Sequence, residues 1–233
     1  MRPLRFLLAP LVLASALAAG CGQDAASVPK TAIAVVGDRT ITRAQFNLLM
    51  SQARQSYAAR GRSFPAPGTQ AYAELKASAI RLLVERAELE QKAPGLGVTI
   101  DGSQVEARRR LLIDETFGGD HDRYRARLRE ERMTDAQVRS ALRGQLLSEA
   151  VFQAVTADVT VTTAAVQRYY EAHLDNYSTT GQTTPFAAVR EPIRRRLLGE
   201  KRTRTFNRWL DGVRREFAPK TAYSAGFAPE DGG

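Results

Sequence analysis

The chain has 233 residues, a length that suffices for one large domain or two small ones. Charged residues make up 25% and hydrophobic residues 43%, which is ordinary for a folded globular protein and excludes a wholly disordered chain. The formal net charge of +9 suits contact with anionic lipid or nucleic acid, but no base-reading motif or stacking platform accompanies it. We therefore expect solvated basic helix faces and no nucleic-acid partner.

The first twenty residues predict a secretory signal peptide. Arg2 and Arg5 give it a positive start, and residues 7–19 form a short apolar core. The sequence LAAG then precedes Cys21, the only cysteine of the chain, and LAAGC is similar to a bacterial lipobox. We expect cleavage before Cys21 and attachment of acyl chains such as palmitate to that residue. Ordinary cleavage that leaves a free thiol is the alternative.

The mature chain begins with a small, polar tether at residues 21–30, followed by two predicted strands and a series of helices. Residues 33–36 and 40–41 form the strands, with a turn signal at Gly37 and Asp38 between them. Apolar residues at helical spacing, capping residues such as Thr42 and Thr134, and Gly or Pro breakers define the helices. Their predicted ranges are 43–60, 69–92, 101–115, 120–131, 134–156 and 163–177.

A final long helix is predicted from residue 184 to residue 217. Thr184 is expected to cap it and Pro185 to occupy its first position. Pro192 and Gly199 fall inside it, so a kink or a split is expected. A helix of roughly 50 Å is not stable alone in water, so it must pack against helices earlier in the chain.

Two short pieces are predicted after the final helix. Residues 220–224 are expected to form a strand that pairs with the strand near Ile33, and residues 225–233 a disordered tail. No segment after the signal peptide has the roughly 20 apolar residues that a transmembrane helix needs. The prediction is a mainly α fold with short strands, in which the long last helix packs back on the amino-terminal helices.

The order of these elements resembles the SurA and PrsA class of extracytoplasmic chaperones. AVVGDRTITRAQF is similar to the opening of that family, VTVTTAAVQRYYEAHLDNY to its helix with paired tyrosines, and PFAAVREPIRRRLLGEKRTRTFNRWLDGVRREF to its closing helix. The resemblance covers nearly all of residues 31–224. It implies a discontinuous helical chaperone domain, like the amino-terminal domain of SurA.

One departure from the family pattern bears on activity. Many relatives carry a parvulin-type peptidyl-prolyl isomerase domain between the helix with paired tyrosines and the closing helix. Here that interval is residues 178–184, which is too short to hold a domain. The resemblance therefore implies the chaperone part without the isomerase, and so a protein that is not an enzyme.

A search for catalytic or metal-binding patterns agrees with that expectation. His121 lies beside Asp120 and Asp122, and His173 lies near Asp175, but we expect surface histidines and not a metal site. The GGD at residues 118–120 lacks the Leu-Gly of the parvulin motif. No Gly-x-Ser-x-Gly elbow, GxGxxG or P-loop occurs. We expect no catalytic residue, no metal and no cofactor.

The remaining candidates are apolar surface residues that could hold an unfolded segment. Exposed apolar patches mark binding sites, although core packing is the alternative for each residue. The six candidates are Phe64, Tyr57, Tyr169, Tyr170, Phe206 and Trp209.

These features together predict a holdase in the bacterial cell envelope, anchored to a membrane through Cys21 and facing the periplasm or extracytoplasmic space. Its expected partners are unfolded or exported polypeptides. One alternative is a structural or adaptor lipoprotein that binds a specific envelope partner. Another is a degenerate peptidyl-prolyl isomerase.

Overall fold

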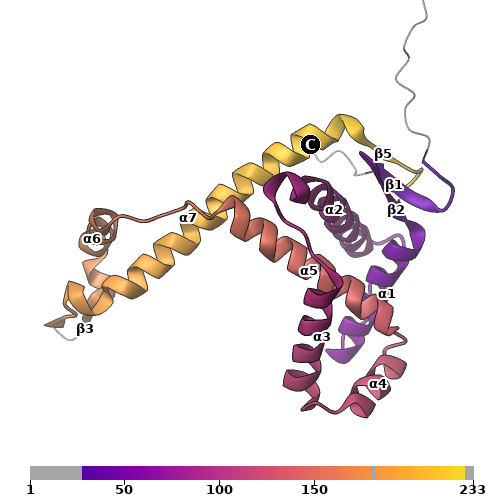
Figure 1. Ribbon diagram of the computed structural model, residues 1–233, viewed down its shortest axis with the longest axis horizontal. Coiled ribbons are helices and arrows are strands. Elements are labelled where there is room, and N and C mark those ends of the chain that lie inside the picture. Colours follow the sequence, from indigo (N-terminus) through magenta and orange to yellow (C-terminus); the bar gives the residue numbers. More distant parts are fainter. Residues whose placement is uncertain (1–27, 180–181, 229–233) are drawn as a thin grey trace, which may run out of the picture.

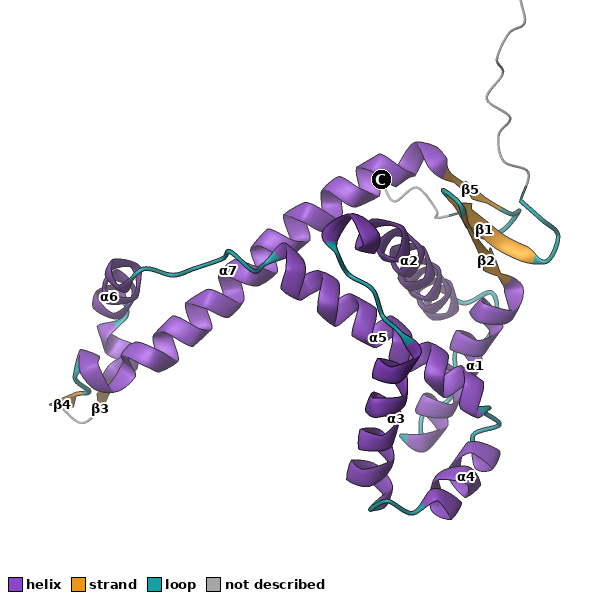
Figure 2. Ribbon diagram, viewed as in Figure 1, coloured by secondary structure: helices purple, strands orange, loops and turns teal. Residues whose placement is uncertain are grey.

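The computed structural model describes residues 28–179 and 182–228, which fold as seven α-helices and a few short strands (Figures 1 and 2). Cys21, the predicted signal peptide and most of the predicted tether lie outside these residues. Figure 1 shows a body built from α1–α5 and a small sheet, from which α6 and the first half of α7 project as an arm. The expected mainly helical fold with short strands and a long carboxy-terminal helix is confirmed.

A three-stranded antiparallel sheet joins the two ends of the described chain. It has the order β2-β1-β5 and consists of β1 (Ala32–Val36), β2 (Arg39–Thr42) and β5 (Thr221–Tyr223). The expected pairing near Ile33 is confirmed, since Ala34 lies opposite Tyr223. Gly37 makes the tight turn after β1 with φ +52°, and a Cβ there would lie 2.3 Å from Oε1 of Gln91. Only glycine fits this turn without displacing its neighbour.

Five helices follow β2 in the body. They are α1 (Arg43–Ala59), α2 (Gln70–Lys92), α3 (Gly102–Phe117), α4 (His121–Glu130) and α5 (Asp135–Val155). The predicted caps are confirmed: the hydroxyls of Thr42 and Thr134 each accept a hydrogen bond from a first-turn N–H, and each forms a capping box with a glutamine. A 3₁₀ turn, Ala93–Leu96, ends α2 at the predicted Pro94 and Gly95.

Two hydrophobic clusters hold the body together, and α7 contributes to both. The first lies between the sheet, α1, α2 and the end of α7, and it includes Ile33, Phe46 and Phe217. The second lies between α2, α3, α5 and α7, and it includes Val151 and Leu210. The last helix therefore packs on elements formed more than a hundred residues earlier, as expected for a discontinuous domain.

The final helix α7 (Phe186–Phe217) is one continuous helix that includes Pro192 and Gly199. It is therefore not split at either residue. The expected capping is wrong: Pro185 is the N-cap, and no side chain caps this end. Thr184 is held elsewhere, since its N–H donates to the carbonyl of Tyr177 across 2.8 Å and its carbonyl accepts from the Tyr170 hydroxyl across 2.8 Å.

The arm consists of α6 (Thr163–Ala172), a 3₁₀ turn (Leu174–Tyr177), the paired strands β3 (Ser178–Thr179) and β4 (Gln182–Thr183), and the first half of α7. The predicted helix to residue 177 is too long, because His173 leaves the helical conformation with φ −133° and ψ +33°. Val166 of α6 and Ile193 of α7 are the buried residues of the arm.

The carboxy-terminal end of the described chain folds back on the sheet. The ring of Phe227, a residue expected in the tail, meets the Phe46 ring edge-on with the centroids 5.2 Å apart. The ammonium group of Lys76 lies 4.8 Å from the same ring. The packed structure thus extends past residue 224, to Phe227.

Candidate functional site

The six aromatic residues predicted to bind polypeptide lie in three separate places. All six are partly buried, and none is fully exposed. The pairs are Tyr57 with Phe64 near the start of α2, Tyr169 with Tyr170 on the arm, and Phe206 with Trp209 where α7 passes α5.

The first pair lies beside a third aromatic ring. The Phe64 ring meets Tyr57 and Tyr72 edge-on, with centroid distances of 5.6 Å and 6.3 Å. The guanidinium group of Arg54 lies 4.8 Å from the centroid of Phe64. These contacts fix the loop between α1 and α2, and Tyr72 continues from them into the groove described below.

The arm tyrosines are used within the arm itself. Tyr170 donates its hydroxyl hydrogen to Thr184, and its ring lies 5.5 Å from that of Phe186. The Tyr169 ring stacks on His173 at 4.1 Å, and the guanidinium group of Arg196 lies 5.3 Å from its centroid. These contacts connect α6 to the start of α7.

The third pair belongs to the core. Phe206 lies 5.2 Å from Phe152 and 5.7 Å from Trp209, measured between ring centroids. Trp209 packs against both hydrophobic clusters, and Phe206 packs against the second. Core packing, the alternative stated for both residues, is what their contacts indicate.

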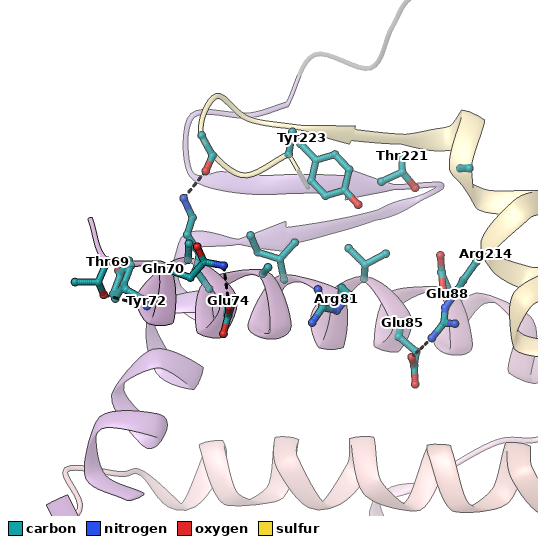
Figure 3. Close-up of a pocket in the computed structure, with 18 of the residues that line it drawn as sticks. Thr69, Gln70, Tyr72, Glu74, Arg81, Glu85, Glu88, Arg214, Thr221 and Tyr223 are labelled. Atoms are coloured by element: carbon teal, nitrogen blue, oxygen red, sulfur yellow. Dashed lines mark hydrogen bonds and ion pairs between the residues drawn. The ribbon is translucent and has the colours of Figure 1, made fainter. Parts of the chain in front are cut away.

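A groove of 1120 Å³ lies between α2 and β5, and Figure 3 shows it in close-up. One flank of α2 forms its floor, with Tyr72 at one end and Glu88 at the other. The end of α7 and the segment after β5 close its sides through Arg214 and Gly226. The residues of α2 that line it are Gln70, Tyr72, Ala73, Glu74, Lys76, Ala77, Ile80, Arg81, Val84, Glu85 and Glu88.

The floor of the groove has an apolar stripe because small and aliphatic residues recur at helical spacing on α2. Ala73, Ala77, Ile80 and Val84 lie within one broad stripe. The alanines leave room that longer side chains would fill. Sequence reasoning missed this stripe because it searched for large aromatic residues, and the stripe consists of small and aliphatic ones.

One strand edge borders the groove. Ser224 donates its N–H to Ile33, and Gly37 donates its N–H to Lys220, so alternate residues of β5 face β1. Thr221 and Tyr223 therefore turn their backbone groups to the outer edge, and both residues line the groove. The Thr221 N–H is bonded to Ala218. By the same alternation, the N–H and carbonyl of Tyr223 point away from β1, toward the outer edge of the sheet.

Charged side chains lie at both ends of the groove. At the end near α7, Arg214 donates to Oε2 of Glu85 across 2.9 Å. At the other end, Lys76 donates to the carbonyl of Gly226. Glu88 is only 3% exposed, and its Oε2 accepts no hydrogen bond within the described chain. Burial raises the pKa of Glu88 above its ordinary value; the Arg214 charge opposes this rise, and the Glu85 charge adds to it.

The described residues give no indication of metal chemistry. No group of three His, Cys, Asp or Glu side chains lies close enough together to hold an ion in residues 28–179 and 182–228. His121 begins α4 and is exposed, and His173 stacks on Tyr169. No helix in these ranges is both long enough and apolar enough to span a membrane.

Comparison with known proteins identifies one family. The model of the SurA-like N-terminal domain matches residues 3–152, which include the sheet strands β1 and β2 and the helices α1 to most of α5. Neither a curated protein nor a solved structure matches the chain. The match spans well over half of the chain. The protein therefore belongs to the family of the SurA-like N-terminal domain, which supports a chaperone-related role with polypeptide partners outside the bacterial cytoplasm.

Proposed function

We propose that this protein is a membrane-anchored holdase that binds unfolded or exported polypeptides in the groove between α2 and β5, without isomerase activity. The observation that carries the proposal is a largely apolar groove beside β5, the edge strand of the sheet, where the backbone groups of Tyr223 point outward. An extended segment can add to such an edge through backbone hydrogen bonds, and this mode depends little on its sequence.

The size of the groove fits such a segment. From Tyr72 to Glu88 the floor of the groove is about 24 Å long at 1.5 Å per residue. An extended chain advances about 3.3 Å per residue, so about seven residues fit along it. Tyr57 and Phe64 extend the apolar surface beyond Tyr72, where the rings can meet the next side chain of a client.

The test of this site uses the full chain in lipid nanodiscs and an unfolded client that aggregates. At near-stoichiometric ratios the wild-type chain should slow aggregation. Ala77→Phe fills the groove and should remove most of this effect. Ala107→Phe, on the exposed surface of α3, is the matched control and should retain it. Equal protection by both variants would show that the groove is not the binding site.

A second experiment tests the strand edge. A seven-residue peptide that binds the groove should lose affinity when alternate backbone nitrogens are methylated, because methylation removes the hydrogens that pair with β5. Methylation of the other alternate set should change affinity little. Similar losses for both sets would argue against strand addition.

The membrane anchor is supported by the LAAGC sequence before the tether. Cells fed labelled palmitate should incorporate the label into the wild-type chain and not into Cys21→Ser. The substituted protein should move from the membrane to the soluble fraction. Labelled Cys21→Ser protein would show that another residue carries the lipid.

The lack of isomerase activity is supported by the connection between α6 and α7. Its described residues form a 3₁₀ turn and a two-stranded hairpin, and they include no separate domain. We expect no acceleration of proline isomerisation in a short peptide at micromolar protein. Clear acceleration would favour the degenerate isomerase instead.

A further inference from the structure

Glu88 is the one groove residue whose chemistry the polypeptide-binding role does not by itself explain. Its carboxylate is buried at the α7 end of the groove, and Oε2 has no hydrogen-bond partner in the described chain. Figure 3 shows Glu88 rising from α2 on the side of β5, beside Arg214. A buried carboxylate oxygen without a donor costs free energy in the unliganded protein.

Two neighbouring donors, Arg214 and Thr221, are engaged elsewhere. The guanidinium group of Arg214 donates to Glu85 across 2.9 Å and to Asp211 across 3.1 Å. The hydroxyl of Thr221 donates to the carbonyl of Phe217 across 2.8 Å. Tyr223 also lines the groove, but its hydroxyl makes no hydrogen bond to Glu88 within the described residues.

The other charges of the groove also have partners. Lys76 donates to the carbonyl of Gly226, Arg81 donates to Ser78, and Glu74 accepts from Gln70. Within the described chain, Oε2 of Glu88 is therefore a buried side-chain acceptor of the groove that no donor occupies.

We propose that this groove selects extended segments that carry a lysine or arginine, whose cationic group donates to Oε2 of Glu88. The inference deepens the proposed function and depends on it, since it assumes that polypeptide binds here. A cationic donor forms the strongest hydrogen bond with a carboxylate, and an acidic side chain at the same place would be repelled. The long, flexible side-chain stems of lysine and arginine can pack along the apolar floor of the groove, on Ile80 and Val84.

The experiment compares three fluorescent peptides of seven residues that differ only at one position, which holds lysine, norleucine or glutamate. Each is titrated with the full chain in nanodiscs, with empty nanodiscs as background, and binding is followed by anisotropy. We expect the lysine peptide to bind about tenfold more tightly than the norleucine peptide, as one charge-assisted hydrogen bond allows. The glutamate peptide should bind weakest.

The matching variant is Glu88→Gln, which keeps the shape of the side chain and removes its charge. In this variant the lysine peptide should bind no more tightly than the norleucine peptide, whose affinity should stay unchanged. That unchanged affinity also shows that the variant folds. Glu115→Gln, on the exposed face of α3, should keep the wild-type order.

Two results overturn the inference, and they differ in what they leave standing. Equal binding of the lysine and norleucine peptides to the wild type, or a lysine preference that survives in Glu88→Gln, rejects selection by Glu88 and leaves peptide binding intact. Absence of binding by all three peptides rejects the proposed function and the inference together.

Discussion

Arg214 of α7 donates from Nη2 to Oε2 of Glu85 on α2 across 2.9 Å, while Glu88, three residues further along α2, receives no hydrogen bond from it. The pair joins the last helix to the second across 129 residues of sequence. It also engages Arg214, whose charge acts on Glu88, and Oε2 of this buried carboxylate has no hydrogen-bond donor within the described chain.

This arrangement predicts how Glu88 affects stability. We expect Glu88→Gln to raise the free energy of unfolding at pH 7 by about 1 kcal/mol, because the neutral amide is cheaper to bury than the charge. Burial raises the pKa of Glu88 in the folded protein above 4.5. The stability that comes from binding this proton is therefore fully present below pH 4.5, and it is lost as the pH rises through the folded-state pKa. The increase in the free energy of unfolding caused by Glu88→Gln should therefore be small below pH 4.5 and grow above it.

Urea unfolding of both proteins across this pH range measures the difference in stability. Glu115→Gln is the control and should stay within about 0.5 kcal/mol of the wild type at each pH. A stability loss in Glu88→Gln at pH 7 would mean that the charged carboxylate is satisfied within the fold.

A second prediction concerns the junction of α3, α4 and α5. Tyr124 is 2% exposed and donates its hydroxyl hydrogen to Oδ1 of Asp135 across 2.6 Å, and Arg109 donates to the same oxygen across 2.7 Å. Partial burial alone would raise the pKa of Asp135, but the hydrogen bonds from Tyr124 and Arg109 outweigh it and lower this pKa. The charged Asp135 therefore stabilises the fold above pH 3.8, and this contribution is lost as the pH falls through the folded-state pKa.

We expect Tyr124→Phe to lower the free energy of unfolding at pH 7 by about 1.5 kcal/mol, since it removes a hydrogen bond to a charged group. The loss should shrink in acid, once Asp135 is protonated. Urea unfolding at pH 7 and pH 3 checks both statements. The control is Tyr57→Phe, because the Tyr57 hydroxyl makes no hydrogen bond in the described chain, and its free energy of unfolding should change little. An equal loss of stability in this control would argue against a role of the bond to Asp135.

A third prediction concerns the middle of α7. Gly199 lies inside this helix, and a Cβ built there meets no atom within 4 Å. Gly199→Ala should raise the free energy of unfolding by about 1 kcal/mol, because alanine loses less backbone entropy in a helix. Thermal unfolding of the variant and the wild type measures this difference in stability. Gly37→Ala, at the turn with positive φ, should destabilise the protein instead; if both changes destabilise, α7 is not regular at residue 199.

A fourth prediction separates the core aromatic residues from the groove. Trp209→Ala should lower the free energy of unfolding by about 2 kcal/mol, since the ring packs against both clusters. Protection of an aggregating client, scaled to the folded fraction, should be unchanged. Reduced protection by fully folded Trp209→Ala protein would restore Trp209 as a client-binding residue.

The candidate site could be predicted from the sequence only in part. The sequence placed Phe64 in the loop before α2 and Tyr57 in the preceding helix, and both rings lie next to Tyr72 at one end of the groove. The arm tyrosines and the pair Phe206 and Trp209 are instead used in packing within the protein. A single aromatic residue in a helix has the same local signal whether it contacts a neighbouring helix or a ligand.

The sequence by itself determined the elements of this protein, because caps, breakers and helical periodicity act over a few residues. Thr42 and Thr134 start their helices as their side chains require, and the strand after α7 pairs with β1. Only the tertiary structure decided which flank of α2 stays uncovered, that β5 leaves an edge beside it, and that Oε2 of Glu88 has no hydrogen-bond partner in residues 28–179 and 182–228. These features depend on where α7 returns to the body, a long-range placement that no local pattern of residues encodes.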